Sequence, residues 1–131
     1  MSHFSTVRTE LRDRQALIEA LVDLGHPPLL EGSQPVRGYR GQTVMADLAV
    51  PQEQGADIGF RWNDAIGSYE LVADLDLWRQ PIPVERFLAR LTQRYALRTI
   101  LAASAEEGFQ VAEQTSQLDG SIELVVSRWD G

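Results

Sequence analysis

Three consecutive runs of alternating hydrophobic residues between residues 44 and 77 constrain the fold most strongly. The residues that share a face are Val44, Ala46, Leu48 and Val50, then Ile58, Phe60 and Trp62, then Tyr69, Leu71, Ala73, Leu75 and Leu77. Successive side chains of a strand point to opposite faces of a sheet, so this period of two predicts three strands. Turn-forming residues occupy 51–55 and 63–68, which predicts an antiparallel meander. Such a sheet needs cover on its apolar face only.

A short strand and a helix are predicted before the meander. Residues 3–11 are rich in threonine and valine and favour a strand. Asp13 can cap a following helix, whose apolar residues recur at three- and four-residue spacing as far as Leu24, where Gly25 ends the pattern. The glycine- and proline-rich stretch 29–41 predicts a loop or an irregular edge strand.

A second helix is predicted after the meander. Pro81 and Pro83 open it, and its apolar residues keep helical spacing as far as Tyr95. Beyond that residue the phase of the apolar stripe slips. We therefore expect a kink or break at residues 94–96 and a second helical piece that ends near residue 107.

The end of the chain predicts a β-hairpin. Its strands are 109–114 and 121–129, and Asp119 and Gly120 supply a turn dipeptide that tolerates positive φ. The whole order of elements predicts one α+β domain over residues 1–131, in which two or three helices cover one face of a mostly antiparallel sheet. A ferredoxin-like arrangement is one form that this class can take.

The composition excludes several kinds of chemistry. The chain has 131 residues and no cysteine, so it forms no disulfide, thiolate zinc site or cysteine-ligated iron–sulfur cluster of its own. All 12 basic residues are arginine, which removes Schiff-base and phosphate-loop lysines. We expect no cofactor. The net charge of −7 disfavours nucleic acids and anionic membranes as partners.

The hydropathy pattern predicts a soluble protein of the cytoplasm. Every long apolar stretch is interrupted by a charged residue well before the roughly 20 residues that a membrane-spanning helix needs. The first 11 residues have neither the basic and apolar segments of a secretory signal nor the arginine and serine content of a transit peptide.

Several short motifs, taken in order, resemble a known family. They are Met1-Ser-His-Phe-Ser, Leu24-Gly25, Glu107-Gly-Phe109, Asp119-Gly-Ser-Ile122 and Arg128-Trp129. The chain is similar over nearly its whole length to the small proteins encoded by the conserved chloroplast reading frame thirty-five, which occurs in cyanobacteria and algal plastids. The resemblance implies a soluble protein of a photosynthetic lineage. It supplies no catalytic or cofactor-binding residues, because the activity of that family is uncharacterised.

Four arginines at i, i+4 spacing form the sharpest local feature. They are Arg86, Arg90, Arg94 and Arg98, and we call them the arginine row. Between residues 79 and 98 five arginines accompany one acidic residue, Glu85. Like charges at this spacing repel, so the three pairs cost the helix about 1 kcal/mol unless something acidic neutralises them.

Two interpretations of the arginine row stay open. In the first, carboxylates of the sheet rim or of Glu10, Asp13 and Glu19 satisfy it within the fold. In the second, the row binds an anion or an acidic partner, because guanidinium groups match carboxylates and phosphates in bidentate geometry.

The acidic residues of the meander suggest a metal site as a second possibility. Asp47, Asp74 and Asp76 fall on its polar face, with Asp57 and Glu70 near them. Calcium and magnesium require several oxygen ligands. Alternation assigns this face to water, however, and no loop shows the spacing of a cation site. We therefore expect a solvated face and no metal.

Histidine and tryptophan provide the remaining candidates. His3 and His26 titrate near neutrality, but no nucleophile motif accompanies either of them. Alternation directs Trp62 into the core and Trp78 away from it. Trp78 is therefore either an exposed anchor for a partner or a residue packed beneath the loop that leads into the second helix.

The sequence favours a non-enzymatic protein of a photosynthetic cell that docks an acidic protein partner through the arginine row and Trp78. The alternative is a metal-dependent enzyme or small-ligand binder that uses the surface carboxylates and a histidine. RNA binding through the row is a third possibility, which the net charge disfavours. No oligomeric state follows from the sequence.

Overall fold

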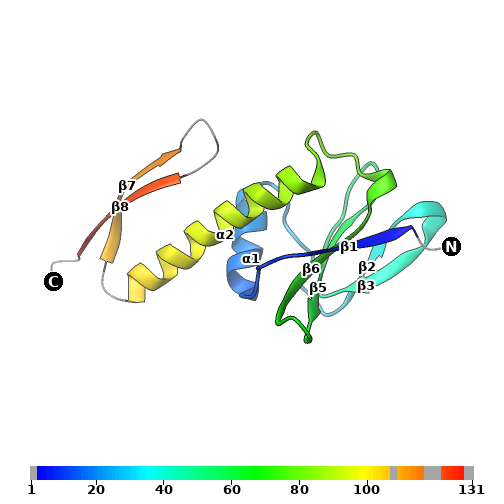
Figure 1. Ribbon diagram of the computed structural model, residues 1–131, viewed down its shortest axis with the longest axis horizontal. Helices are drawn as coiled ribbons and strands as arrows, with labels where there is room; N and C mark the ends of the chain where they lie inside the picture. Colours follow the sequence, from blue (N-terminus) through cyan, green and yellow to red (C-terminus); the bar gives the residue numbers. More distant parts are fainter. Residues whose placement is uncertain (1–2, 107–108, 117–121, 129–131) are drawn as a thin grey trace.

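The described part of the protein combines a four-stranded sheet, two α-helices and two smaller two-stranded sheets (Figure 1). A computed structural model describes residues 3–106, 109–116 and 122–128. The elements, including two short 3-10 helices η1 and η2, are β1 (Phe4–Arg8), α1 (Arg14–Asp23), β2 (Gln34–Arg37), η1 (Tyr39–Gly41), β3 (Thr43–Ala46), β4 (Leu48–Val50), β5 (Ile58–Asn63), β6 (Ser68–Asp74), η2 (Leu75–Leu77), α2 (Val84–Glu106), β7 (Phe109–Ser116) and β8 (Ile122–Arg128).

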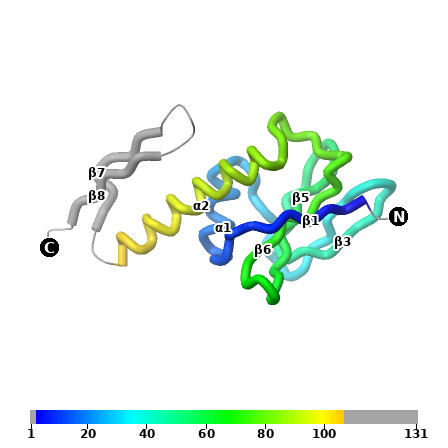
Figure 2. The backbone as a smooth tube through the Cα atoms, viewed as in Figure 1, coloured from blue at the N-terminus to red at the C-terminus, as the bar shows by residue number. Residues whose placement is uncertain are grey.

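The main sheet is antiparallel, with strand order β1-β6-β5-β4. Leu48 lies opposite Phe60, and Phe60 lies opposite Leu71, so these three side chains share one face. On the other edge of β6, Val7 of β1 lies opposite Leu71. The predicted N-terminal strand is therefore confirmed, and it lies beside β6 although the two are far apart in sequence (Figure 2).

The first run of the predicted meander is two strands rather than one. The strand is interrupted at Asp47. The N–H of Asp47 donates to the carbonyl of Phe60, and its carboxylate accepts from the N–H of Trp62. β4 continues in the main sheet, whereas β3 pairs with β2 in a separate hairpin. The edge strand that was one alternative for the stretch 29–41 is therefore confirmed at residues 34–37, although it is regular, and the alternative of a loop was wrong there.

Both helices cover the same face of the main sheet. Asp13 caps α1 as predicted, because its carboxylate accepts from the N–H of Ala16. The core on this face consists of buried residues from both helices, from the sheet and from Leu11, which precedes α1: Leu11, Leu17, Ala20, Leu21, Leu48, Val50, Ile58, Phe60, Tyr69, Leu71, Ala73, Phe87 and Leu91. This confirms the predicted apolar face for β4, β5 and β6, whereas Val44 and Ala46, which alternation assigns to the same face, pack in a different core.

The opposite face of the sheet is also covered, which the sequence did not predict. The β2–β3 hairpin packs on it through a second small core of Val36, Ala46 and Ala49. Every residue of β6 is consequently buried. The close approach depends on Gly59, because a Cβ there would lie 2.6 Å from Cγ2 of Val36. The expectation of a solvated polar face was therefore wrong.

Helix α2 is one continuous helix of 23 residues, so the expected kink at residues 94–96 was wrong. Its buried residues are Phe87, Leu91 and Leu97. The apolar residues of the slipped stripe are Leu97, Ile100 and Leu101, of which Leu97 is buried and Ile100 is 47% exposed. The hydroxyl oxygen of Tyr95 accepts hydrogen bonds from the N–H groups of residues 12 and 13, which fastens α2 to the start of α1. Neither α2 nor any other helix in the described part of the chain is both long and apolar enough to cross a membrane.

The predicted C-terminal hairpin is confirmed in its backbone pairing, because β7 and β8 are antiparallel partners. The expected turn residues, Asp119 and Gly120, lie outside the described residues. β7 and β8 form a sheet of their own. The fold is therefore α+β, as predicted, but the strand after α2 does not return to the main sheet as it does in a ferredoxin-like arrangement.

The contact between the β2–β3 hairpin and the sheet predicts a measurable coupling. We expect Gly59→Ala to cost about 1–3 kcal/mol of unfolding free energy, because its Cβ would overlap the Val36 side chain. In a Val36→Ala background the same change should cost less, since the overlapping methyl is gone. Urea unfolding of the four proteins of this double-mutant cycle measures the coupling. Additive effects would mean that the hairpin does not cover this face.

Candidate functional site

The structure divides the arginine row into two pairs. Arg94 and Arg98 both bind Asp23, the last residue of α1. The Nε atoms of both arginines lie 2.7 Å from Oδ2 of Asp23, and Nη2 of Arg98 lies 2.5 Å from its Oδ1. The first interpretation thus holds for this half of the row, although its main partner is Asp23 rather than a residue that the sequence suggested. Glu19 adds a weaker attraction for Arg98.

The ion-pair cluster of Asp23, Arg94 and Arg98 shifts the ionisation of its members. The hydrogen bond from Arg98 lowers the pKa of Asp23 to about 2, against the opposing effect of burial and with a further contribution from Arg94. The hydrogen bond from Asp23 raises the pKa of Arg98. The carboxylate therefore stays charged throughout the physiological range, and it joins the two helices at their crossing.

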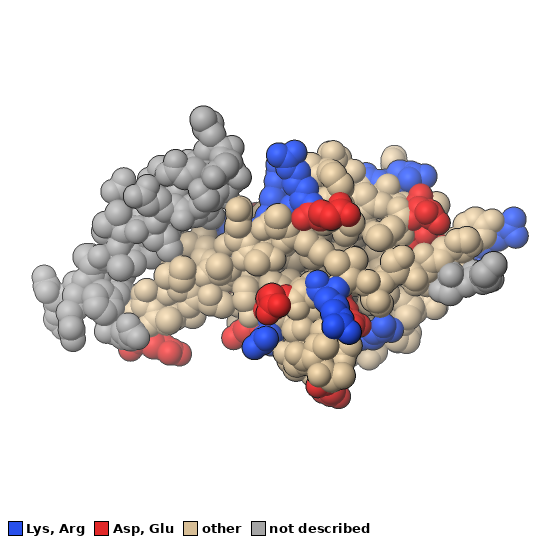
Figure 3. Space-filling view, in the orientation of Figure 1, with Lys and Arg blue, Asp and Glu red and all other residues tan. Residues whose placement is uncertain are grey.

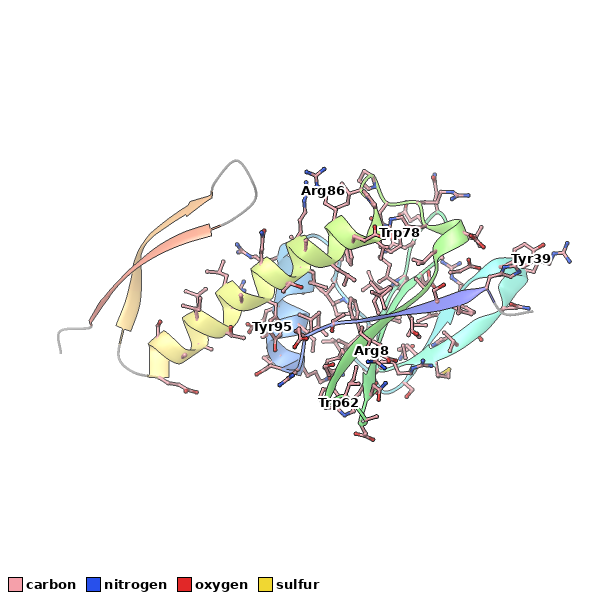
Figure 4. All side chains as sticks on the ribbon, in the orientation of Figure 1. Arg8, Tyr39, Trp62, Trp78, Arg86 and Tyr95 are labelled. Atoms are coloured by element: carbon pink, nitrogen blue, oxygen red, sulfur yellow. The ribbon has the colours of Figure 1, made fainter. Side chains whose placement is uncertain are left out.

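The other half of the row is unpaired. Arg86 and Arg90 are exposed, and the side chain of neither makes a hydrogen bond or ion pair with any residue in the described part of the chain. The side chain of Arg86 projects from the first turns of α2, away from the sheet (Figure 4). On the face drawn in Figure 3 basic and acidic side chains are otherwise scattered rather than gathered into one large patch. This pair of arginines is the part of the row that is available for binding.

Asp57 has a structural role that the sequence did not reveal. It is 3% exposed, and its carboxylate accepts four hydrogen bonds. Three come from the backbone N–H, Nε and Nη2 of Arg37, and the fourth comes from the backbone N–H of Gln52, at distances of 2.9 to 3.0 Å. Burial alone would raise the pKa of Asp57, but these hydrogen bonds outweigh it and the pKa is lowered.

The remaining acidic candidates have separate partners. Asp74 is fully buried and accepts from the N–H of Tyr39. Asp47 accepts from the N–H of Trp62, Asp76 lies 3.6 Å from Nδ1 of His3, and Glu70 accepts from Asn63. In the part of the chain that the structure describes, no group of three or more acidic or histidine side chains could hold a metal ion. The predicted carboxylates therefore do not converge on one site.

The two histidines lie in different surroundings. The ring of His3 is an edge-to-face neighbour of Tyr39, with centroids 4.7 Å apart. His26 is half-buried after α1, and its ring makes an edge-to-face contact with Phe87 at 5.4 Å. Burial lowers the pKa of His26, so its imidazole is neutral at neutral pH.

The environments of the two tryptophans are the reverse of those that alternation predicts. Trp62 lies at the end of β5, 38% exposed, with its indole N–H donated to Asp64. Trp78 is half-buried because the strand ends at Asp74 and the 3-10 turn η2 interrupts the alternation. Its indole N–H donates to the carbonyl of Ile82, and its ring contacts Phe87. Trp78 thus packs beneath the loop before α2, the second of the two positions considered for it.

A cleft of about 580 Å³, which sequence patterns did not reveal, lies where three loops meet. Its walls come from residues 25–27 and 29 after α1, residues 50–54 from the end of β4 onward, and residues 79–80 before α2. These loops are distant in sequence, and no residue type occurs in all three of them. To predict that the three loops meet, one would have to know the positions of β4 and β6 in the main sheet. Like the exposed pair on α2, this loop cleft presents polar side chains to solvent.

Comparison with known proteins now places the chain. The model of the family described as "Protein of unknown function (DUF1257)" matches residues 20–125, which span Asp23, the cleft and the arginine row. The chain belongs to this family. It is 42% identical over 129 residues to the "Uncharacterized protein ycf35" of Guillardia theta, with 98% of each chain covered. No solved structure matches the chain.

Two further relatives carry the same name. The chain is 42% identical to the protein from Pyropia yezoensis over 130 residues, with 99% of each chain covered. It is 39% identical to the protein from Cyanophora paradoxa over 129 residues, with 98% of each chain covered. The resemblance that the short motifs indicate is therefore confirmed over almost the full length of this DUF1257 protein.

The pKa of Asp23 predicts how the helix contact responds to acid. Because its folded pKa of about 2 lies below the ordinary value of 3.8, the contact contributes its full stability above about pH 4 and loses it as the pH falls towards 2. We expect Asp23→Asn to cost about 1–2 kcal/mol at neutral pH, and that cost to shrink below pH 4. Urea unfolding across this range measures it. A cost independent of pH would contradict the assignment.

The hydrogen bonds of Asp57 predict that its substitution lowers the unfolding free energy by more than that of Asp23 and also loosens the cleft wall. We expect Asp57→Asn to cost about 2–4 kcal/mol, because buried N–H donors lose a charged acceptor. Hydrogen exchange at the amide of Gln52 should also accelerate relative to the core strands. Asp76→Asn is the matched control, since the Asp76 side chain is 83% exposed. Unchanged protection at Gln52 would show that Asp57 does not hold this loop.

Proposed function

We propose that this DUF1257 protein is a non-enzymatic interaction protein that docks an acidic protein partner through Arg86 and Arg90 on α2. The observation that carries the proposal is that both guanidinium groups are exposed and have no partner among the described residues. Folding leaves their mutual repulsion uncompensated, and a carboxylate-bearing partner would relieve it. Binding should therefore stabilise α2 as well as the complex.

The proposed site is narrower than the whole arginine row. Arg94 and Arg98 already bind Asp23, and Trp78 is engaged beneath the loop before α2. The remaining pair has the spacing of one helical turn, which suits two carboxylates on one helix or strand of a partner. The overall charge of −7 would repel an acidic partner elsewhere on the surface, so the contact should be orientation-specific.

The geometry supports docking over the metal-dependent alternative. Of the carboxylates that the alternative requires, Asp47 and Asp74 accept from the backbone N–H groups of Trp62 and Tyr39. Asp76 makes a single pair with His3, so the three carboxylates are not brought together. The resemblance to relatives of photosynthetic lineage supports a place for the protein in the cytoplasm or the equivalent plastid compartment, with a partner that belongs to the assembly or regulation of the photosynthetic machinery.

The test is recovery of the partner from an extract of the source cells. We expect the wild type to retain one stoichiometric partner at low salt and release it as salt rises, because screening weakens exposed charge pairs. The double variant Arg86→Glu, Arg90→Glu should lose that partner. It should keep its thermal stability, since a carboxylate at position 90 would attract Arg94 at i, i+4 spacing.

The control is the double variant Arg8→Glu, Arg14→Glu, which makes the same change in net charge at exposed positions of β1 and α1. It should recover the partner as the wild type does. If the α2 variant retains the same amount of partner, docking through this pair is wrong. If both variants lose it equally, the contact depends on net charge rather than on α2.

A further inference from the structure

The loop cleft has the size and construction of a small-ligand site. Its volume of about 580 Å³ lies within the range of about 300–1,000 Å³ that is typical of such sites. Apolar surface from Pro27, Leu29 and Pro51 lines it together with polar side chains. Leu29 is 45% exposed, so its side chain offers apolar surface to a molecule in the cleft.

The walls of the cleft are fixed before any ligand binds. Both backbone groups of Gln52 are held, because its N–H donates to Asp57 at 2.9 Å and its carbonyl accepts from Nη2 of Arg37 at 2.7 Å. The Gln52 side-chain oxygen accepts from Nε2 of Gln80 at 2.7 Å, which joins the second wall to the third. The N–H of Leu29 donates to the carbonyl of residue 49 and fastens the first wall to β4. A preformed site loses little entropy on binding.

One cation in the cleft is available to a ligand. Arg79 is exposed, and its guanidinium reaches only the backbone carbonyls of Asp76 and Trp78, at 3.5 and 3.1 Å. No carboxylate in residues 3–106 pairs with it. The imidazole of His26 also lines the cleft, and its nitrogens have no hydrogen-bond partner among those residues. The two side chains can together bind an acceptor group.

The charge of the cleft selects among anions. His26 is neutral at neutral pH, so Arg79 supplies the only positive charge among the lining residues. The carboxylate of Glu53 lines the same cleft and would repel a second negative charge on the ligand. This balance favours a monoanion over a phosphate dianion, and a planar carboxylate fits the fork of a guanidinium.

We propose that this cleft binds a small organic carboxylic acid, with the carboxylate at Arg79 and His26 and an apolar body against Leu29 and Pro51. This site is separate from Arg86 and Arg90 on α2, the docking pair of the proposed function, and does not depend on them.

The experiment is a titration of the full chain with benzoate, followed by proton–nitrogen correlation NMR. We expect saturable shifts of the amides of Gly25, Gln52 and Gln80, with a dissociation constant on the order of millimolar for so small a probe. Benzamide has the same shape without the charge and should bind about tenfold more weakly. Phenyl phosphate tests the selectivity against dianions.

Two variants locate the binding. Arg79→Gln keeps the methylene groups that pack over Gly55, so the fold should survive, and it should weaken benzoate binding about tenfold or more. Leu29→Ser should weaken the binding of benzoate and leave the binding of acetate, which lacks the apolar body, unchanged. Arg8→Gln removes an exposed charge on β1 and should change neither.

Any one of the following outcomes would overturn the proposal. They are an absence of saturable shifts with benzoate, shifts that map outside the three loops, and binding that Arg79→Gln leaves intact. Equal binding of benzamide and benzoate would also overturn it, because the charge of the carboxylate would then contribute nothing to binding. Because the docking test uses other residues and a protein partner, failure of one proposal leaves the other standing.

Discussion

The buried carboxylate of Asp57 is the interaction on which the layered structure depends. It lies just before β5 and collects donors from β2 and from the loop after β4, so one side chain ties the hairpin layer to the main sheet. A buried charge is stable only when its hydrogen-bonding capacity is filled, and here four N–H groups fill it. The same network holds the backbone of Gln52, and the cleft wall is therefore a consequence of how the two layers are joined.

A second charged cluster joins the helices. Asp23 at the end of α1 receives Arg94 and Arg98 of α2, and Tyr95, between them in sequence, receives two backbone N–H groups at the start of α1. The two contacts lie at opposite ends of α1 and together fix how the helices cross. Because Asp23 uses two of the four arginines, the row's unpaired positive charge is confined to the first turns of α2.

Local patterns predicted the part of the fold that depends on period and capping, and they failed where distant segments meet. Alternation along β5 and β6 predicts the helix-covered face, and Asp13 caps α1 as its position suggests. The burial of the second face could not be predicted. Alternation reports the polarity of each side chain, and it carries no information about which segment of the chain packs over that face. The same holds for the sites. Asp23, which divides the arginine row, lies 71 residues from Arg94, and alternation misplaces Trp78 where β6 gives way to η2. The cleft likewise joins three loops through strand order, which no local pattern encodes.

The two proposed sites are built around one aromatic anchor. Phe87, 3% exposed near the start of α2, contacts the ring of His26 at 5.4 Å and the ring of Trp78 at 5.5 Å. The first contact positions a wall of the cleft, and the second fixes the loop that carries Arg79. Since Arg86 precedes Phe87 directly, the same anchor sets the position of the docking pair. Function at either site thus rests on the packing of the helix start rather than on the sheet edges.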